Sequence, residues 1–275
     1  MNGYEMDELR IALALTPGVG GATALRVLKR NAELGRTPSE FFALSARELQ
    51  EQYGLREKSA SAIAASERLR PLVDETIVRL SEKPVQLVFL GEPGYPNRLA
   101  EFSRKPPPML WLYGNTMVLS GATFAVLGSR DVDKRAADEI ERQAERGVLD
   151  AKSLVTSANS PAYQRAAVVP LRWGSPRVLV LDRGLFSALG PGLTDEPFRA
   201  ARLWRFQFDP QTDLVVTEHR PHDGFCRGHN ARRDAAVVGL ADEIVAVQPR
   251  AGGNVERLVG QAQDAGRRVR VIRLD

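Results

Sequence analysis

Residues 123–130 read TFAVLGSR, a short apolar run that ends in Gly128, Ser129 and Arg130. The run predicts a buried strand, and its Gly-Ser ending predicts a turn into a helix over residues 136–148. A strand that ends in this way offers an edge for phosphate, to which Ser129 can donate a hydroxyl and Arg130 a charged fork. The segment lacks the full GxGxxG pattern, so its meaning depends on the rest of the chain.

Strands and helices alternate on both sides of this segment. We expect strands at VQLVFL (85–90), SLVTS (153–157), RVLVL (177–181), LVVTE (214–218), DEIVAV (242–247) and RRVRVIRL (267–274), and helices at 136–148, 162–169 and 254–265. Continuous apolar strands that alternate with helices predict a mostly parallel sheet covered on both faces. The predicted fold class is α/β, with a Rossmann-like sheet.

The first 80 residues have apolar positions at helical spacing instead. Pro71 is expected to break one helical stretch, and Ser39 is expected to cap another. The chain therefore divides into a small all-α helix-hairpin-helix (SAM-like) domain at 1–82, a Pro-rich linker and extension at 83–120, and the Rossmann-like domain at 121–275.

Composition excludes several classes of protein. The 275 residues are 43% hydrophobic and 26% charged, as in ordinary globular proteins, and no apolar run reaches the ~18 residues of a membrane span. With one cysteine and no visible leader, we expect a cytoplasmic protein without membrane contact. The net charge is +4, and 32 of 38 basic residues are arginine, which suits phosphate binding but also fits a general compositional bias.

The N-terminal domain contains the turn LTPGVG at residues 15–20. Gly18, Val19 and Gly20 match the Gly-hydrophobic-Gly turn of a helix-hairpin-helix, in which amides at a helix N-terminus can hold a DNA phosphate. The alternative is that the hairpin serves only for packing.

Two segments near the C-terminus could also bind phosphate. QPRAGGNVE (248–256) places Gly252, Gly253 and Asn254 at the start of a helix, where amides could bind an anion, although a plain tight connection is as good an interpretation. Arg232 and Arg233 belong to a basic stretch that is either a phosphate track or a solvated face.

All three histidines and the only cysteine fall in one short segment, as His219, His222, Cys226 and His229. These residue types are zinc ligands, so a structural zinc site is one interpretation and would be the only cofactor. The spacing matches no known finger, and a basic loop with neutral histidines that faces phosphate is the favoured alternative.

The order of the motifs resembles the DNA-processing protein A family (DprA/Smf). The similar elements are GYPNRL (94–99), PPPMLWLYGN (106–115), VLGSR (126–130) and the hairpin in front of them, and looser similarities continue to AGGN (251–254). The resemblance implies a protein that binds single-stranded DNA on its Rossmann-like domain, forms a homodimer, loads a RecA-type recombinase during natural transformation and has no enzymatic activity.

The resemblance also implies which residues contact DNA. Gly128, Ser129 and Arg130 match the family's phosphate site, Ser157 its conserved serine segment, Arg233 its basic segment, and Gly252 and Gly253 its glycine loop. The chain departs from the family at residues 157–164, where a Gly-Ile-Asp is missing and Gln164 replaces a histidine. It also departs in the basic segment, where it has Arg233-Asp234-Ala235 or a displaced His229-Asn230-Ala231-Arg232.

Two alternatives to a recombination mediator follow from these departures. One is a degenerate scaffold that binds protein partners in DNA uptake or defence. The other is a nucleotide phosphoribohydrolase-like enzyme, because residues 249–256 faintly resemble its glycine loop.

Overall fold

The computed structural model describes residues 8–129 and 131–274. Contacts divide the chain into two compact units. Unit 1 comprises the chain up to Tyr95 together with Pro107–Leu110, and unit 2 comprises Pro96–Pro106 with the chain from Trp111 onward. The Pro-rich stretch 83–120 is therefore shared between the two units.

Unit 1 is mainly helical. Its elements are α1 (Glu8–Leu15), α2 (Gly21–Leu34), α3 (Pro38–Phe42), α4 (Ala46–Tyr53), α5 (Glu57–Ala64), η1 (Ser66–Leu69), α6 (Arg70–Leu80) and β1 (Val85–Phe89). Pro71 occupies the first turn of α6, where its missing amide costs nothing, so the expected break between helices is confirmed. The expected Ser39 cap is wrong: Thr37 caps α3, because its side chain accepts from the Glu40 amide in a capping box.

A buried ion pair joins α1 to the segment after β1 within unit 1. Arg10 donates to both carboxylate oxygens of Glu92, at 2.9 and 2.7 Å, and to the carbonyl of Leu87 at 3.0 Å. Burial alone would raise the pKa of Glu92, but the bonds from Arg10 and from the Phe89 amide outweigh it and lower that pKa. Glu92 is therefore ionised, and the opposite charges of Arg10 and Glu92 compensate each other in their buried position.

Unit 2 contains the sheet that the sequence predicts. Its elements are α7 (Asn97–Phe102), β2 (Met109–Gly114, of which the first two residues lie in unit 1), η2 (Thr116–Ser120), β3 (Thr123–Gly128), α8 (Lys134–Leu149), β4 (Ser153–Thr156), α9 (Pro161–Ala167), α10 (Val169–Trp173), β5 (Arg177–Val180), α11 (Leu185–Leu189), η3 (Arg199–Leu203), β6 (Leu214–Thr217), α12 (His229–Leu240), β7 (Glu243–Val247), α13 (Asn254–Asp264) and β8 (Arg268–Ile272). The strand order is β1-β2-β6-β5-β4-β3-β7-β8.

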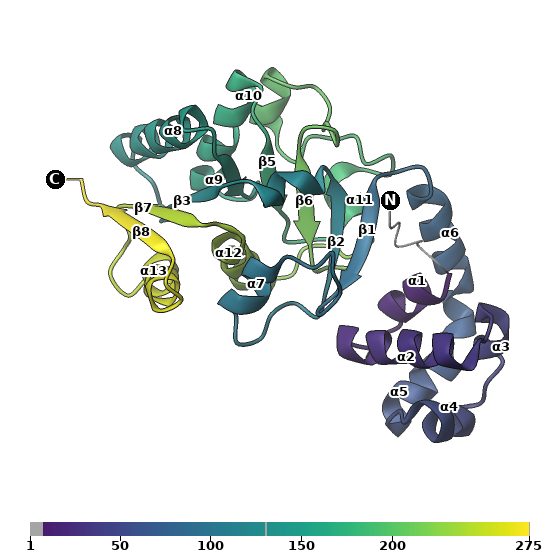
Figure 1. The fold of residues 1–275 in the computed structure, drawn as a ribbon. Coiled ribbons are helices and arrows are strands. Elements are labelled where there is room, and N and C mark those ends of the chain that lie inside the picture. Colours follow the sequence, from purple (N-terminus) through teal and green to yellow (C-terminus); the bar gives the residue numbers. More distant parts are fainter. Residues whose placement is uncertain (1–7, 130, 275) are drawn as a thin grey trace. The chain divides into compact units, whose positions relative to one another are not determined.

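The sheet is mostly parallel and covered on both faces, as expected. Neighbours from β6 to β8 run parallel, and β2 pairs antiparallel with β6. Helices α8, α9 and α10 lie on one face, and α7, α12 and α13 lie on the other (Figure 1). The strand β2 was not expected from the sequence, because it follows three consecutive prolines in an irregular stretch. No helix in the described ranges is long and apolar enough to cross a membrane.

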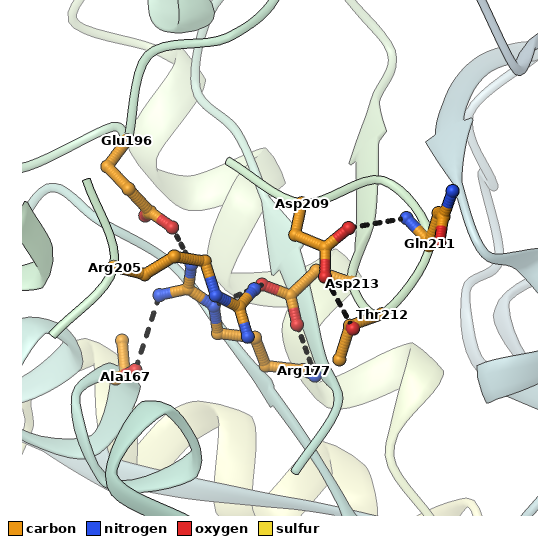
Figure 2. Close-up of polar contacts among 8 residues, drawn as sticks. All are labelled: Ala167, Arg177, Glu196, Arg205, Asp209, Gln211, Thr212 and Asp213. Atoms are coloured by element: carbon orange, nitrogen blue, oxygen red, sulfur yellow. Dashed lines mark hydrogen bonds and ion pairs between the residues drawn. The ribbon is translucent and has the colours of Figure 1, made fainter. Parts of the chain in front are cut away.

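A buried charge network holds the long connection between β5 and β6. Arg177, at the start of β5, donates from Nε to Asp213 at 2.8 Å and from Nη2 to Glu196 at 2.5 Å, and all three side chains are fully buried. Arg205 adds a second bond to Asp213 at 2.8 Å (Figure 2). Burial opposes the charge, but the two carboxylates raise the pKa of Arg177 above its ordinary value.

This network should be costly to break. Arg177→Ala leaves two buried carboxylates with too few partners, so we expect the free energy of unfolding to fall by about 3–5 kcal/mol in urea denaturation followed by circular dichroism. Arg47→Ala, which removes an exposed pair with Glu51, is the control and should cost less than about 1 kcal/mol. Equal, small effects of the two substitutions would contradict a stabilising role for Arg177.

Candidate functional site

A cleft opens where the strand order reverses. The chain passes from β3 through β4, β5 and β6 in one direction and then returns to β7 on the other side of β3. Open α/β sheets bind ligands at such a point, at the carboxyl ends of the strands. The cleft has a volume of about 710 Å³ and is lined by Leu127, Gly128, Ser129, Asp131, Val132, Asp133, Ala136, Asn159, Ser160, Tyr163, Asn230, Arg233, Asp234, Gln248, Pro249, Arg250, Gly253, Asn254, Val255 and Leu258.

The end of β3 is tied to the loop after β7 through one hydroxyl. Ser129 Oγ donates to the carbonyl of Gln248 at 3.2 Å and accepts from the amide of Arg250 at 3.0 Å. A Cβ at Gly128 would lie 2.7 Å from Ile140 Cδ1 and 3.0 Å from Ala162 Cβ, so a larger residue would require the Ile140 side chain to move. The predicted Gly128 and Ser129 thus line the cleft, with Ser129 bonded to the neighbouring loop; Arg130 lies outside the described residues.

Asp234 is the polar centre of the cleft. Its Oδ1 accepts from the hydroxyl of Tyr163 at 2.8 Å and from Nε of Arg233 at 2.9 Å. Its Oδ2 accepts from the side-chain Nδ2 of Asn254 at 2.8 Å. One carboxylate therefore joins α9, α12 and α13. Burial raises the pKa of Tyr163 well above its ordinary value, so its hydroxyl remains a donor to Asp234.

Arg233 carries a charge that its surroundings satisfy only in part. The residue is 5% exposed, and its guanidinium lies over the Tyr163 ring at 4.9 Å from the centroid. Nε and Nη2 bond to Asp234, whereas Nη1 has no hydrogen-bond partner among the described residues. A buried N–H without a partner is costly, and a ligand anion is the group that would satisfy a guanidinium.

The neighbouring Arg232 is placed differently. Its Nε and Nη2 bind the two carboxylate oxygens of Glu218 at 2.6 and 2.7 Å, and it does not line the cleft. Burial raises the pKa of Glu218 although Arg232 opposes that shift. Ser157 is buried and is also not among the cleft-lining residues. The structure thus brings together Ser129, Arg233 and Asn254, but not Ser157 or Arg232.

Helix N-termini at the cleft are already occupied by the chain's own carboxylates. Asp133 accepts from the Ala136 amide at the start of α8, and Glu256 accepts from the Gly252 amide ahead of α13, at 2.8 and 2.7 Å. Gly252 has a positive φ of 69°, which places its amide for this contact. The predicted glycine loop therefore presents fewer free donors than its sequence indicates, and the donors left at the cleft include Nη1 of Arg233 and the exposed Arg250.

The expected zinc loop is not formed. The His219 and His229 rings stack with centroids 3.7 Å apart, and His229 Nδ1 lies 2.7 Å from the carbonyl of Asp182. His222 packs its ring against Phe186, and Cys226 is exposed. Among the described side chains no group of three or more suitable ligands could hold a metal ion. The four residues do not converge, because His219 and His229 stack on each other while His222 packs against Phe186 and Cys226 is exposed.

The hairpin turn of unit 1 has the geometry that its glycines suggest. Gly18 has a φ of 81°, Val19 is buried, and the Gly20 carbonyl accepts from the Ala24 amide at 2.9 Å in the first turn of α2. Whether this turn contacts DNA stays a prediction.

Sequence reasoning missed Tyr163, Asp234, Asn159 and Asn230. Asn159 donates to Asp182 and, at 2.8 Å, to Asn230. Their only sequence signal was their position inside the two segments that depart from the family pattern. Both departures meet in the cleft, since Tyr163 and Asp234 are hydrogen-bonded.

Burial of His219 makes stability depend on pH. Burial is the main cause that lowers the pKa of His219 to about 4. The unfolded chain takes up this proton near pH 6.5 and the folded chain only near pH 4, so the free energy of unfolding should fall by roughly 2–3 kcal/mol across that window. We expect His219→Gln to flatten this part of the pH–stability curve and His222→Gln to preserve it; a slope unchanged in His219→Gln would contradict the assignment.

Comparison with known proteins agrees with this fold. The model of the family described as DNA recombination-mediator protein A matches residues 86–159. No curated protein matches the chain significantly. The structure is similar to DNA processing protein A (DprA) from Streptococcus pneumoniae, with a TM-score of 0.69, 18% identity, and coverage of 97% of this chain and 86% of that chain.

A second similar structure is DNA processing protein A from Helicobacter pylori, described for its single-stranded DNA binding mode. It has a TM-score of 0.53 and 14% identity, and the alignment covers 70% of this chain and 81% of that chain. At these identities the likeness shows a shared fold. The family model matches residues 86–159, and over the rest of the chain the likeness is one of fold.

Proposed function

We propose that this protein is a DNA recombination mediator that binds single-stranded DNA across the cleft between β3 and β7. The observation that carries the proposal is Arg233: its buried guanidinium lines the cleft, and its Nη1 has no hydrogen-bond partner within residues 8–129 and 131–274. The planar guanidinium of arginine donates two parallel, charge-assisted hydrogen bonds to phosphate oxygens, and such bonds are stronger than those between neutral groups. A phosphate of the strand is the anion that we assign to Arg233.

The electrostatics of the cleft favour a few directed contacts. Asp131, Asp133 and Asp234 line it together with Arg233 and the exposed Arg250, so it is not uniformly basic. Asp234 offsets part of the charge of Arg233 and fixes its orientation. Binding should therefore depend on how one or two phosphates fit the cleft. The association constant should fall modestly with salt, with a slope of about −0.7 per neutralised phosphate in a plot of log K against the logarithm of the salt concentration.

The chemistry proposed is binding, and the cleft is assigned no reaction. The family likeness also motivates two further proposals: that the chain forms a homodimer, and that it delivers the bound strand to a RecA-type recombinase. Support for these comes from the family alone.

Arg233 should be needed for binding where Arg232 is not. We expect Arg233→Ala to weaken binding of a fluorescent oligo(dT) roughly 5- to 150-fold in an anisotropy titration, because a hydrogen-bonded charge contributes about 1–3 kcal/mol. Arg232→Ala is the matched control. It removes a charge that Glu218 already neutralises and should change the dissociation constant less than about threefold.

A conservative substitution at Arg233 distinguishes a loss of binding from a loss of folding. Arg233→Lys keeps a charge but lacks the fork, so it should fold, bind more weakly than the parent protein, and show the same thermal midpoint within a few degrees. If Arg233→Ala and Arg233→Lys, both folded, bind as the parent does, the assigned phosphate contact is wrong. If the parent protein binds no oligo(dT) at low salt, the proposed function is wrong.

The homodimer is tested by mass. Soluble oligomers most often have twofold symmetry, so light scattering at micromolar concentration should give twice the chain mass of 30.2 kDa. A monomer mass across the concentration range would overturn this proposal without affecting the DNA site.

A further inference from the structure

Four large apolar side chains are exposed on η3, on the segment that follows it, and at the end of α10, whose Arg172 lies over the Trp204 ring. Leu203, Trp204 and Phe206 are 84%, 52% and 80% exposed, and Trp173, at the end of α10, is 51% exposed. We call these four residues the tryptophan patch. Leaving so much aromatic surface in water is unfavourable, and exposed patches of this kind mark binding sites.

The backbone that carries the patch is firmly anchored in unit 2. Phe198 and Ala201 are buried against Ala158, Ala167 and Val168, so η3 packs on α9 and its connections. The next residue after Trp204, Arg205, bonds to Asp213 in the buried network of Arg177. The exposed side chains are therefore presented from a fixed segment.

Arginines surround the patch in excess over carboxylates. The Arg172 guanidinium lies 5.0 Å from the centroid of the Trp204 ring. Arg172 and Arg165 share a single carboxylate, that of Glu141. Arg199 and Arg202 are exposed on η3, and no salt bridge joins either of them to a described residue.

This combination selects one class of ligand. Sites for single-stranded nucleic acid combine aromatic faces for the bases with positive charge for the backbone, and Arg199 and Arg202 supply positive charge that no described carboxylate pairs. Trp204, with Arg172 over its ring, and the neighbouring Trp173 and Phe206 offer stacking faces. Arg199 and Arg202 offer contacts for phosphates.

The patch can be reached from the cleft along α9 and α10. Ser160 and Tyr163, at the start of α9, line the cleft, and Trp173 ends α10. The 13 residues from Pro161 to Trp173 would span about 20 Å at 1.5 Å per residue if they formed one straight helix. A strand of several nucleotides covers that separation.

We propose that single-stranded DNA held in the cleft continues onto the tryptophan patch, where its bases stack on Trp204 and Trp173. This inference rests on the proposed function, because the cleft supplies the first contact. It adds a base-stacking subsite that is separate from the phosphate site at Arg233.

Intrinsic fluorescence reports directly on this subsite. The chain has three tryptophans, and the third, Trp111, is fully buried. We expect oligo(dT) of 20 nucleotides to quench the fluorescence of the parent protein, and we expect Trp173→Phe combined with Trp204→Phe to abolish that quenching while DNA still binds. Quenching that persists in this double variant would overturn the proposal.

Affinity and strand length supply an independent readout. Trp204→Ala combined with Phe206→Ala should weaken binding of the 20-mer roughly 5- to 100-fold, and should leave binding of a 5-mer, which the cleft alone can hold, nearly unchanged. The conservative single variant Trp204→Phe should retain most of the parent protein's affinity for the 20-mer. Leu149→Ala, at a residue 63% exposed at the end of α8, is the control and should have no effect.

The outcomes separate this inference from the proposed function. Suppose that binding depends on Arg233 but does not quench the fluorescence, and that the double variant Trp204→Ala with Phe206→Ala binds DNA of every length as the parent does. This result overturns the stacking subsite and leaves the proposed cleft site intact. Absence of any binding to oligo(dT) overturns both. If the same pair of substitutions leaves DNA binding unchanged but lowers the mass measured by light scattering, the patch is a protein interface and the inference is wrong.

Discussion

The parallel pairing of β3 with β7 is the constraint on which the rest of the site depends. The two strands align over five residue pairs, from Phe124 with Glu243 to Gly128 with Val247, so that they end at the same level. Asp242 fixes this register, because its carboxylate accepts from the Thr123 amide at 2.9 Å and from its hydroxyl at 3.1 Å. A shift of register would separate Ser129 from the loop at Gln248, and the cleft would lose one wall.

The same constraint explains why the alternation of strands and helices was predictable. Strands such as 153–156 and 243–247 are buried on both faces, so they are continuously apolar in sequence, and helices appear between them. The strand β2 escaped prediction because it follows prolines. The α3 cap was misassigned because Thr37 and Ser39 are both chemically suited to it. Local chemistry alone does not decide between two such neighbours.

The site itself was predictable only in part. Gly128, Ser129, Arg233 and Asn254 were found because strand ends and glycine turns leave a pattern in sequence. Asp234 was missed, since its role depends on Tyr163, which lies 71 residues away in the chain. The histidines show the converse: they are neighbours in sequence, but His222 packs away from the stacked pair His219 and His229, and the zinc interpretation gains no support among the described side chains. Contacts across the fold decide such roles, and a single sequence does not contain them.

Carboxylates within the cleft neutralise part of its positive charge. Asp133 and Glu256 accept from amides near the helix N-termini. Asp234 orients Arg233, and one nitrogen of Arg233 has no partner in the part of the chain that the structure describes. The most direct test of this account is hydrogen–deuterium exchange with and without saturating oligo(dT). The account predicts slowed exchange in residues 157–163, 229–234 and 248–257, which surround Arg233. Unchanged exchange in these segments with bound oligo(dT), or protection confined to unit 1, would contradict it.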